Sequence, residues 1–514
     1  MISRRKFAAT LAAAPFLLRG QTRDLKARIR IDAERVIGTI DPKIYGNFTE
    51  HLGRCIQGGI FEEGSPLADA SGYRRDVIEA VRNLHVGLLR WPGGNFSSNY
   101  HWLDGIGPRD QRPKRLDMAW QSIEDNRFGT HEFLNYVEML GIEPYVCANF
   151  GTGAWTEAQQ WVEYCNLAEG TAMTDLRRKN GREKPWKVTY WGLGNEMDGP
   201  WQMGHRSAED YGKFALEGAK LMKWTDPNVK LIAAGSSDFA TRERWTEWNR
   251  TVLTHLNGHA DFLSLHTYVG DSDNDYLSFI ANSIDLTDRI RTTEGIIRSV
   301  VEPQSRRPIY IAFDEWNVWY RERGAGKEEG RRILEEIYDL QDALVVATML
   351  NTFVNNAHIV KIANMAQLVN VIAPIFTNEK GLFLQTIYYP LQLFAANVKG
   401  TALEVFVDSP SYATKRFDKV PYLDVSASLD QGKVVVNVVN RHPEQEIEAE
   451  IEPQDGRFAG QIEVAVVNGS GLKVHNGFDS QNVKTANSVE TVSGSKVVHR
   501  FAPHSFTQIR ATLG

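Results

Sequence analysis

Short apolar runs alternate with longer amphipathic segments between residues 42 and 395, and this alternation leaves few possible folds. Eight apolar runs have the length of a strand: residues 44–48, 87–91, 144–149, 188–192, 229–234, 261–266, 309–313 and 359–363. Helical patterns lie between them, for example over 73–84, 130–140, 207–223 and 332–356. Eight strand–helix units predict a (β/α)8 barrel enlarged by loop insertions. A doubly wound open sheet is the alternative, but no Gly-rich phosphate-binding fingerprint follows the first strand.

The pattern changes near residue 400. Residues 422–428, 433–439, 446–451 and 461–467 alternate apolar and polar side chains between turn signals, which is typical of an antiparallel β-sandwich. Residues 27–32 alternate in the same way ahead of the barrel, so we expect them to add a strand to this sandwich. The predicted fold class is therefore α/β, with a TIM barrel over 42–395 and an all-β sandwich built from 24–41 and 396–514.

A basic and then apolar N-terminus predicts export. Residues 3–6, Ser-Arg-Arg-Lys, precede an Ala-rich apolar stretch that ends at Leu18. This arrangement resembles a twin-arginine signal peptide, which we place at residues 1–22. The stretch is too short to cross a bilayer as a helix, and no other segment is long and apolar enough. The expected location is periplasmic or extracellular.

Composition narrows the class of partner. A net charge of −6 is small for 514 residues and argues against a surface for nucleic acid or anionic membranes. The three cysteines, Cys55, Cys147 and Cys165, are too few for a disulfide framework, and no Cys/His spacing suits zinc. The 13 Trp and 17 Tyr are generous, and such rings suit sugar faces as well as a large core.

Polar side chains recur where the predicted barrel strands end. In a (β/α)8 barrel the C-terminal ends of the strands carry the chemistry. We therefore expect the following residues around the mouth of the barrel: Glu50, His51, Arg90, Asn95, Asn149, Asn195, Glu196, His266, Tyr268, Asp314, Glu315, Trp316 and Gln367. A strand-end polar residue on its own is unremarkable, whereas the pattern across seven strands indicates a site.

Two of these residues suit the hydrolysis of a glycoside. That reaction needs a protonated carboxyl group for the leaving oxygen and an ionised one that attacks or activates water. Glu196 and Glu315 follow the fourth and seventh strands, so they can face each other across the barrel mouth. A gap of about 5 Å between them would give retention of configuration. Arg90 is placed to keep the nucleophile ionised, and His266 is either a supporting residue or a core histidine.

Seven sequence motifs, in this order along the chain, resemble the α-L-arabinofuranosidases of glycoside hydrolase family 51. They are GNFTEHLGRCIQGGI, LRWPGGNFSSNYHW, DMAWQSIEDNRFGTHEF, WGLGNEMDGPWQMGH, FLSLHTY, IAFDEWNVWY and NMAQLVNVIAPI. The resemblance extends over residues 27–514 and is strongest between 44 and 376. Two departures stand out: many members lack an export signal, and Gln57 occupies a position where a Tyr is expected.

The resemblance implies roles for individual residues. Glu196 is implied as the acid/base and Glu315 as the nucleophile. The implied ligands of the arabinofuranosyl ring are Glu50, Asn95, Asn195, Tyr268 and Gln367. The resemblance also implies a retaining mechanism, no cofactor and no metal, and a homo-oligomer that is often a hexamer.

The favoured hypothesis is an exo-acting hydrolase that removes α-L-arabinofuranosyl groups from arabinan or arabinoxylan. A rival within the same barrel class is an endoglucanase or a xylosidase. A rival from another class is a carbohydrate-binding protein on an inactive barrel. The sequence also leaves open whether Trp191 and Trp201, which flank Asn195 and Glu196, touch sugar or only pack.

Overall fold

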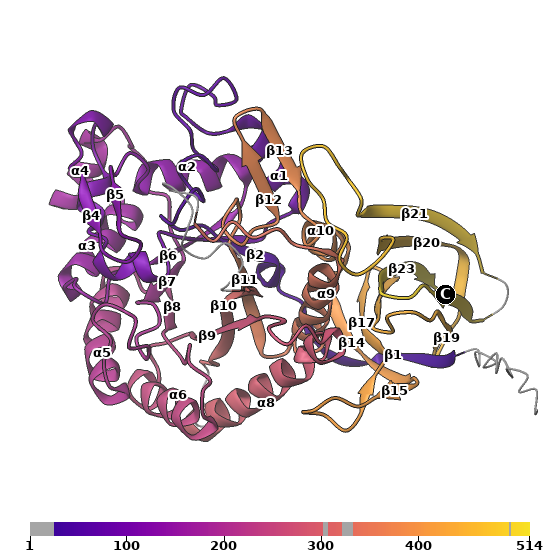
Figure 1. Cartoon of the computed structure of the whole chain (residues 1–514). Coiled ribbons are helices and arrows are strands. Elements are labelled where there is room, and N and C mark those ends of the chain that lie inside the picture. The colour runs from indigo at the N-terminus through magenta and orange to yellow at the C-terminus, as the bar shows by residue number, and fades with distance from the viewer. Residues whose placement is uncertain (1–24, 302–306, 321–332, 493–494) are drawn as a thin grey trace, which may run out of the picture.

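The eight predicted strands form a closed parallel barrel (Figure 1). A computed structural model describes residues 25–301, 307–320, 333–492 and 495–514. Around the barrel, in hydrogen-bonded order, the strands are β10 (Tyr310–Val318), β11 (Val360–Ala366), β2 (Gly46–Phe48), β3 (Leu88–Trp91), β6 (Glu143–Cys147), β7 (Tyr190–Leu193), β8 (Lys230–Ala233) and β9 (Phe262–Val269). The barrel prediction is confirmed, and its closure excludes the open-sheet alternative.

Helices surround the barrel on the outside (Figure 1). They are α1 (Arg75–Leu84), α2 (Thr130–Leu140), α3 (Trp155–Asn166), α4 (Ala172–Lys179), α5 (Ala208–Thr225), α6 (Arg242–Leu256), α7 (Tyr276–Ile280), α8 (Asn282–Val300), α9 (Leu340–Val354) and α10 (Tyr388–Asn397). The helix predicted over 332–356 begins only at Leu340, because Asp339 and Asp342 form a capping box at that point. None of the helices in the described ranges has the length and apolar character needed to span a bilayer.

Nine strands form a second, C-terminal sheet. Their order is β21 (Lys484–Thr491), β20 (Phe458–Asn468), β23 (Ser505–Leu513), β18 (Lys433–Asn440), β17 (Leu423–Asp430), β14 (Thr401–Asp408), β1 (Leu25–Thr39), β19 (Ile447–Pro453) and β22 (Val497–Phe501). Strand β1 runs antiparallel to β14 and parallel to β19. Ile31 of β1, Ile462 of β20 and Val497 of β22 share one hydrophobic core, so the sheet curls around it.

Short elements complete the fold. The small hairpins pair β4 (Arg115–Asp117) with β5 (Ser122–Glu124), β12 (Ile375–Asn378) with β13 (Gly381–Leu384), and β15 (Ser411–Tyr412) with β16 (Val420–Pro421). The 3-10 turns are η1 (Pro42–Tyr45), η2 (Asn95–Asn99), η3 (Trp102–Gly105) and η4 (Arg109–Gln111).

Helix α9 joins the barrel to the C-terminal sheet. All 15 of its residues are buried, which explains why its sequence is mostly apolar. One of its buried polar residues, Asn351, donates from Nδ2 to Oδ1 of Asp424 at 2.7 Å and accepts from Ser426 Oγ at 2.6 Å. The two parts of the chain therefore meet across a buried and hydrogen-bonded contact.

Candidate active site

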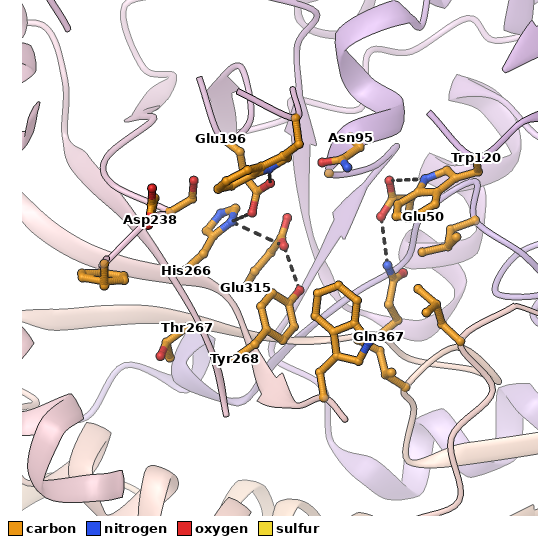
Figure 2. Close-up of a pocket in the computed structure, with 18 of the residues that line it drawn as sticks. Glu50, Asn95, Trp120, Glu196, Asp238, His266, Thr267, Tyr268, Glu315 and Gln367 are labelled. Carbon is orange, nitrogen blue, oxygen red and sulfur yellow. Dashed lines mark hydrogen bonds and ion pairs between the residues drawn. The ribbon is translucent and has the colours of Figure 1, made fainter. Parts of the chain in front are cut away.

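A cavity of about 650 Å³ opens at the C-terminal ends of the barrel strands and contains most of the predicted residues (Figure 2). The predicted residues that line it are Glu50, Asn95, Glu196, His266, Tyr268, Glu315 and Gln367. Arg90 and Asn195 are buried behind this lining. The structure thus brings all nine predicted site residues together at one end of the barrel.

Glu196 and Glu315 approach each other closely. Glu196 follows β7 and has a positive φ of 45°, directly after the turn at Gly194, which has φ 89°. Glu315 lies within β10, next to His266 of β9 in register. One ligand atom from each of Glu196, His266 and Glu315 lies within 4.8 Å of the other two. The ends of β7 and β10 therefore place two carboxylates close enough to flank one glycosidic bond.

Arg90 holds Glu315 in place from below. Its Nη1 donates to Glu315 Oε1 at 2.8 Å, and its Nη2 donates to Asn195 Oδ1 at 2.6 Å. The guanidinium is fully buried and lies over the ring of Phe48, 4.6 Å from the ring centroid. Tyr268 donates from its hydroxyl to Glu315 Oε2 at 2.8 Å. Both oxygens of Glu315 thus receive a hydrogen bond, which favours the ionised form.

His266 bridges the carboxylates. Its Nδ1 lies 2.9 Å from Glu196 Oε1 and 3.4 Å from Glu315 Oε2, while its Nε2 lies 3.3 Å from Asp314 Oδ1. Burial lowers the pKa of His266, but the surrounding carboxylates raise it well above its ordinary value. Burial raises the pKa of Asp314, yet Arg90 and His266 lower it to about 2. The carboxylates therefore favour the imidazolium form of His266.

Glu196 and Glu315 titrate as a pair. Burial raises the pKa of Glu196, but the hydrogen bond with His266 lowers it below its ordinary value. Burial raises the pKa of Glu315, and this outweighs the lowering by His266 and Arg90. Within the pair, His266 therefore favours the ionised form of Glu196, whereas burial and the charge of Glu196 make Glu315 keep its proton more readily.

A second set of polar groups lies on the opposite side of the cavity from Asp238 (Figure 2). Glu50 Oε1 accepts from Trp120 Nε1 at 3.0 Å and from the Phe96 backbone N–H at 3.1 Å. Its Oε2 accepts from Gln367 Nε2 at 3.0 Å. Burial and then the charge of Glu315 raise the pKa of Glu50 to about 7. This side offers carboxylate and amide groups to hydroxyls.

Gly94 lies where these groups converge. A Cβ atom at this position would lie 2.9 Å from Glu315 Oε1, 3.4 Å from Glu50 Oε2 and 3.5 Å from Asn195 Nδ2. The missing side chain therefore leaves room for the nucleophile and for the groups that surround a ligand. The Gly-Gly pair before Asn95 thus has a steric role as well as a turn role.

Asn195, which the resemblance implies as a ligand of the sugar, also has partners within the protein. Its Oδ1 is taken by Arg90, and its Nδ2 donates to Gln202 Oε1 at 3.4 Å. Gln202 in turn donates from Nε2 to Ser98 Oγ. Asn195 therefore connects the guanidinium below the nucleophile to the loop of residues 92–129.

Sequence reasoning missed Trp120 and left the role of Trp201 open. Trp120 donates to Glu50, and Trp201 donates from Nε1 to Glu196 Oε2 at 2.5 Å while its side chain stays half exposed at 51%. Trp191 is fully buried and donates to the Val188 carbonyl, so it only packs. Trp120 and Trp201 both lie inside motifs of the sequence, but their roles depend on the direction of the indole N–H groups, which the sequence does not give.

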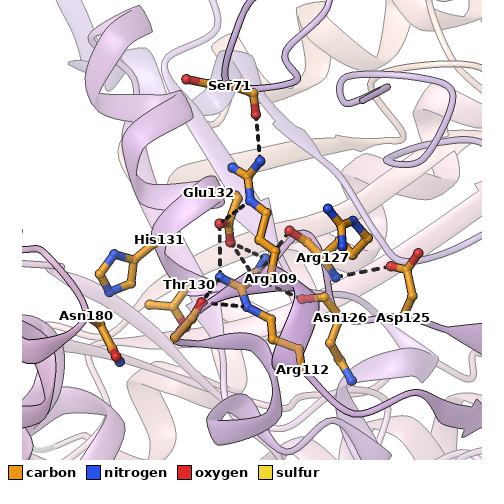
Figure 3. A network of polar contacts seen from close by, with 12 residues as sticks. Ser71, Arg109, Arg112, Asp125, Asn126, Arg127, Thr130, His131, Glu132 and Asn180 are labelled. Carbon is orange, nitrogen blue, oxygen red and sulfur yellow. Dashed lines mark hydrogen bonds and ion pairs between the residues drawn. The ribbon is translucent and has the colours of Figure 1, made fainter. Parts of the chain in front are cut away.

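The loop of residues 92–129 carries Asn95 and Trp120, and an ion-pair network anchors it (Figure 3). Glu132, in the first turn of α2, accepts from Arg112 Nη1 at 2.9 Å and from Arg109 Nε at 3.0 Å. Arg112 also donates to the backbone carbonyls of Gly107 and Asn126, each at 2.9 Å. Side chains that face the cavity are thus positioned by charges outside it.

The chain matches known families and structures along nearly its whole length. The model of the α-L-arabinofuranosidase 1 domain matches residues 80–275, and that of the α-L-arabinofuranosidase C-terminal domain matches 314–505. The intracellular exo-α-(1→5)-L-arabinofuranosidase 1 of Bacillus subtilis is 40% identical over 495 residues, 94% of this chain and 99% of that protein. The intracellular exo-α-(1→5)-L-arabinofuranosidase of Halalkalibacterium halodurans is 39% identical over 495 residues, 95% of this chain and 99% of that protein.

A solved structure agrees with the fold as well. The crystal structure of α-L-arabinofuranosidase from Thermotoga maritima in complex with arabinose superposes with a TM-score of 0.87 at 39% identity. The superposition covers 95% of this chain and 100% of that chain. The barrel and the C-terminal sheet are therefore both part of the shared architecture.

The prediction that the chain is exported is wrong. The relatives from Bacillus subtilis and Halalkalibacterium halodurans are both named intracellular enzymes. A few basic residues followed by alanines make a weak signal, because a short stretch of this composition also arises by chance. Residues 1–22 themselves lie outside the described residues.

The matches and the geometry agree on one family. The strand-end carboxylates, Arg90 beneath them and the polar groups around Glu50 occur within a fold shared with these enzymes. Relatives that are about 40% identical over 94% of the chain leave no place for assignment to an endoglucanase or xylosidase family. The chain belongs to the α-L-arabinofuranosidases of glycoside hydrolase family 51.

Proposed function

We propose that this enzyme releases terminal, non-reducing α-L-arabinofuranosyl groups from arabinan- or arabinoxylan-type oligosaccharides by a retaining double displacement. The observation that carries the mechanism is the approach of Glu196 and Glu315 to within 4.8 Å. Retaining glycosidases have carboxyl groups about 5–5.5 Å apart, whereas inverting ones need about 6.5–9.5 Å to admit a water molecule. Exo action on (1→5) linkages is carried over from the Bacillus subtilis relative's name.

In the first step Glu315 attacks the anomeric carbon while Glu196 donates a proton to the leaving oxygen. Arg90 and Tyr268 hold the two oxygens of Glu315 with hydrogen bonds of 2.8 Å each, which orients the carboxylate for attack. The proton for the leaving group comes from the contact between His266 Nδ1 and Glu196 Oε1, 2.9 Å long. When the proton lies on Glu196 Oε1, the carboxyl group is the acid that the reaction needs.

In the second step Glu196 acts as a base toward water. Once Glu315 is esterified, its negative charge no longer faces His266, so the pKa of His266 and of Glu196 falls. Glu196 then takes a proton from water, and the hydroxide attacks the anomeric carbon and releases Glu315. The bond broken is the ester bond to Glu315, and the sugar leaves with its original configuration.

The arabinofuranosyl ring is assigned to the side of the cavity with Glu50. Glu50 and Gln367 offer acceptors and donors for sugar hydroxyls, and Asn95 lies between them and Glu196 (Figure 2). Asn195 and Tyr268 complete the proposed set around the anomeric centre. An analogue that lacks one of the sugar hydroxyls would leave such buried polar groups imperfectly paired, which gives the site its selectivity.

Variants of the two carboxylates test the mechanism. Glu315→Gln should lower kcat by at least about a thousandfold on every arabinofuranoside, because no nucleophile remains. Glu196→Ala should lose roughly 10²- to 10⁴-fold on oligosaccharides but much less on an aryl arabinofuranoside, whose leaving group needs little protonation. NMR of the first product formed by the wild type should show the α-anomer, and a β-anomer would reject the retaining mechanism.

The two rival functions are separated by the same preparation. Aryl α-L-arabinofuranoside should be hydrolysed far faster than aryl β-glucoside or β-xyloside, and the reverse order would favour the rivals. Sugar binding without turnover of any activated furanoside would favour the carbohydrate-binding protein. The homo-oligomer stays a prediction that light scattering tests, and no nucleic-acid or membrane partner is proposed.

A further inference from the structure

The cavity extends beyond the groups proposed to hold the arabinofuranosyl ring. A cavity of about 650 Å³ accommodates a ligand the size of a drug molecule, which is larger than one pentose. Part of the remaining lining is a surface that we name the β8–β9 wall. It consists of Ser237, Asp238 and Phe239 after β8, Thr267 of β9 and Arg289 of α8.

The order of strands places this wall on the far side of the catalytic pair. Between β7 and β10, which carry Glu196 and Glu315, one arc of the barrel holds β8 and β9. The other arc holds β11, β2, β3 and β6, and Glu50, Asn95 and Gln367 belong to it. Figure 2 shows Asp238 and Glu50 on opposite sides of the pair. A sugar that continues past the cleaved bond therefore meets the wall.

The chemistry of the wall suits a sugar ring. The guanidinium of Arg289 lies over the ring of Phe239, 4.1 Å from its centroid. Arg289 Nη1 donates to Thr267 Oγ1 at 3.1 Å, and Nη2 lies 2.7 Å from Asp285 Oδ2. Its side chain is still 23% exposed. The wall thus combines an aromatic surface for C–H groups with a fixed cation that donates to hydroxyls.

The loop that carries Phe239 is fixed to the loop that carries Glu196. Asp198, two residues after Glu196, accepts from the Ser237 backbone N–H at 2.8 Å and from its Oγ at 2.5 Å. Asp198 also accepts from the Asp238 backbone N–H at 3.1 Å. Asp238 forms an ion pair with Arg244 at 3.0 Å. The wall therefore keeps a constant position relative to the acid that protonates the leaving oxygen.

We propose that the β8–β9 wall binds the sugar residue on the leaving-group side of the cleaved bond, with Phe239 packed against its C–H face and Arg289 donating to its hydroxyls. This inference rests on the proposed function, since it takes Glu196 as the acid that faces the leaving group. It assigns Phe239 and Arg289 to the choice of substrate rather than to the chemical step. A pre-formed wall of this kind strengthens binding because little order is lost when the sugar arrives.

Phe239→Ala tests the wall through the ratio of kcat/KM for two substrates. (1→5)-Linked arabinotriose has a sugar as its leaving group, whereas methyl α-L-arabinofuranoside has only a methyl group. The ratio of kcat/KM for arabinotriose to that for the methyl glycoside should fall roughly tenfold in Phe239→Ala. Phe239→Tyr, which keeps a ring, should restore most of the ratio. Phe406→Ala, an exposed ring on β14 of the other sheet, is the matched control and should keep the wild-type ratio.

An unchanged ratio in Phe239→Ala, or an equal loss on both substrates, would overturn the inference. Binding to the inactive Glu315→Gln background gives an independent measurement by calorimetry. Adding Phe239→Ala there should weaken arabinotriose binding several-fold more than arabinose binding, and equal weakening would also count against the wall. A wild-type chain that hydrolyses neither substrate would reject the proposed function instead, and the calorimetry would still decide on the wall.

Discussion

Glu50 illustrates how a single buried carboxylate makes the active site costly to fold. It is only 3% exposed and accepts three hydrogen bonds, from Phe96, Trp120 and Gln367. Burial raises the pKa of Glu50, and the negative charge of Glu315 raises it further. The three hydrogen bonds offset only part of this increase, so the pKa rises to about 7. The folded chain is therefore less stable when Glu50 is ionised and no ligand is bound.

Replacing Glu50 should change how stability depends on pH. The ordinary pKa is 4.5, so between pH 4.5 and 7 the folded chain keeps a proton that the unfolded chain has released. Stability due to this group is thus greatest at low pH and falls as pH rises to about 7, by about 3 kcal/mol. Urea unfolding should show that the stability of Glu50→Gln relative to the wild type is higher at pH 8 than at pH 5. An equal difference in free energy of unfolding between variant and wild type at both pH values would contradict this. The variant should also lose activity.

At the scale of elements, the loop of residues 92–129 depends on α2. Glu132 at the start of α2 is 5% exposed and pairs with Arg112, whose side chain is 3% exposed. Burial raises the pKa of Glu132, but the hydrogen bonds from Arg112 lower it below its ordinary value. Because the same loop carries Asn95 and Trp120, an ion pair outside the cavity sets the shape of the cavity.

Breaking this pair should affect stability and substrate binding together. Glu132→Gln leaves the buried Arg112 without its anion and should cost about 3–5 kcal/mol at pH 7. The difference from wild type should shrink as pH falls below 4.5, since the wild-type carboxylate then becomes protonated. KM should rise more than kcat falls. Glu138→Gln, on the same helix but 57% exposed, is the control and should change stability by less than about 0.5 kcal/mol.

At the scale of the whole molecule, strand β1 ties the two ends of the chain together. It precedes the barrel in sequence, yet it lies between β14 and β19 in the C-terminal sheet. Its register runs from Arg28 opposite Asp408 to Thr39 opposite Thr401, and from Leu25 beside Ile447 to Ile31 beside Pro453. The sheet is therefore complete only when the N-terminal segment has been incorporated.

Truncation should show this dependence. A chain that begins at residue 25 should fold and keep its activity, because every described strand is present. A chain that begins at residue 40 lacks β1, which leaves β14 and β19 with unpaired edges and exposes the core around Ile29 and Ile31. This shorter chain should be insoluble or lose several degrees in Tm. A soluble product with the Tm of the longer chain would show that β1 is dispensable.

Much of the architecture was predictable because it depends on local periodicity. The eight barrel strands were placed correctly, since a buried parallel strand is an apolar run whatever surrounds it. The start of α9 was misjudged by several residues because Asp339 and Asp342 cap the helix after the apolar pattern has begun. The export signal was a false positive, since a short basic and apolar stretch contains too little information.

Which residues stand at the ends of the strands is readable from the chain's local pattern, because strand length and barrel topology send those ends to one face. For the same reason, the pattern indicates that Glu196 and Glu315 belong to one site. The folded chain adds the separation of the two carboxylates, the bridging by His266, and the N–H groups that Trp120 and Trp201 direct at Glu50 and Glu196. Those features depend on the register between strands and on loops far apart in the chain, and a local pattern carries no record of either.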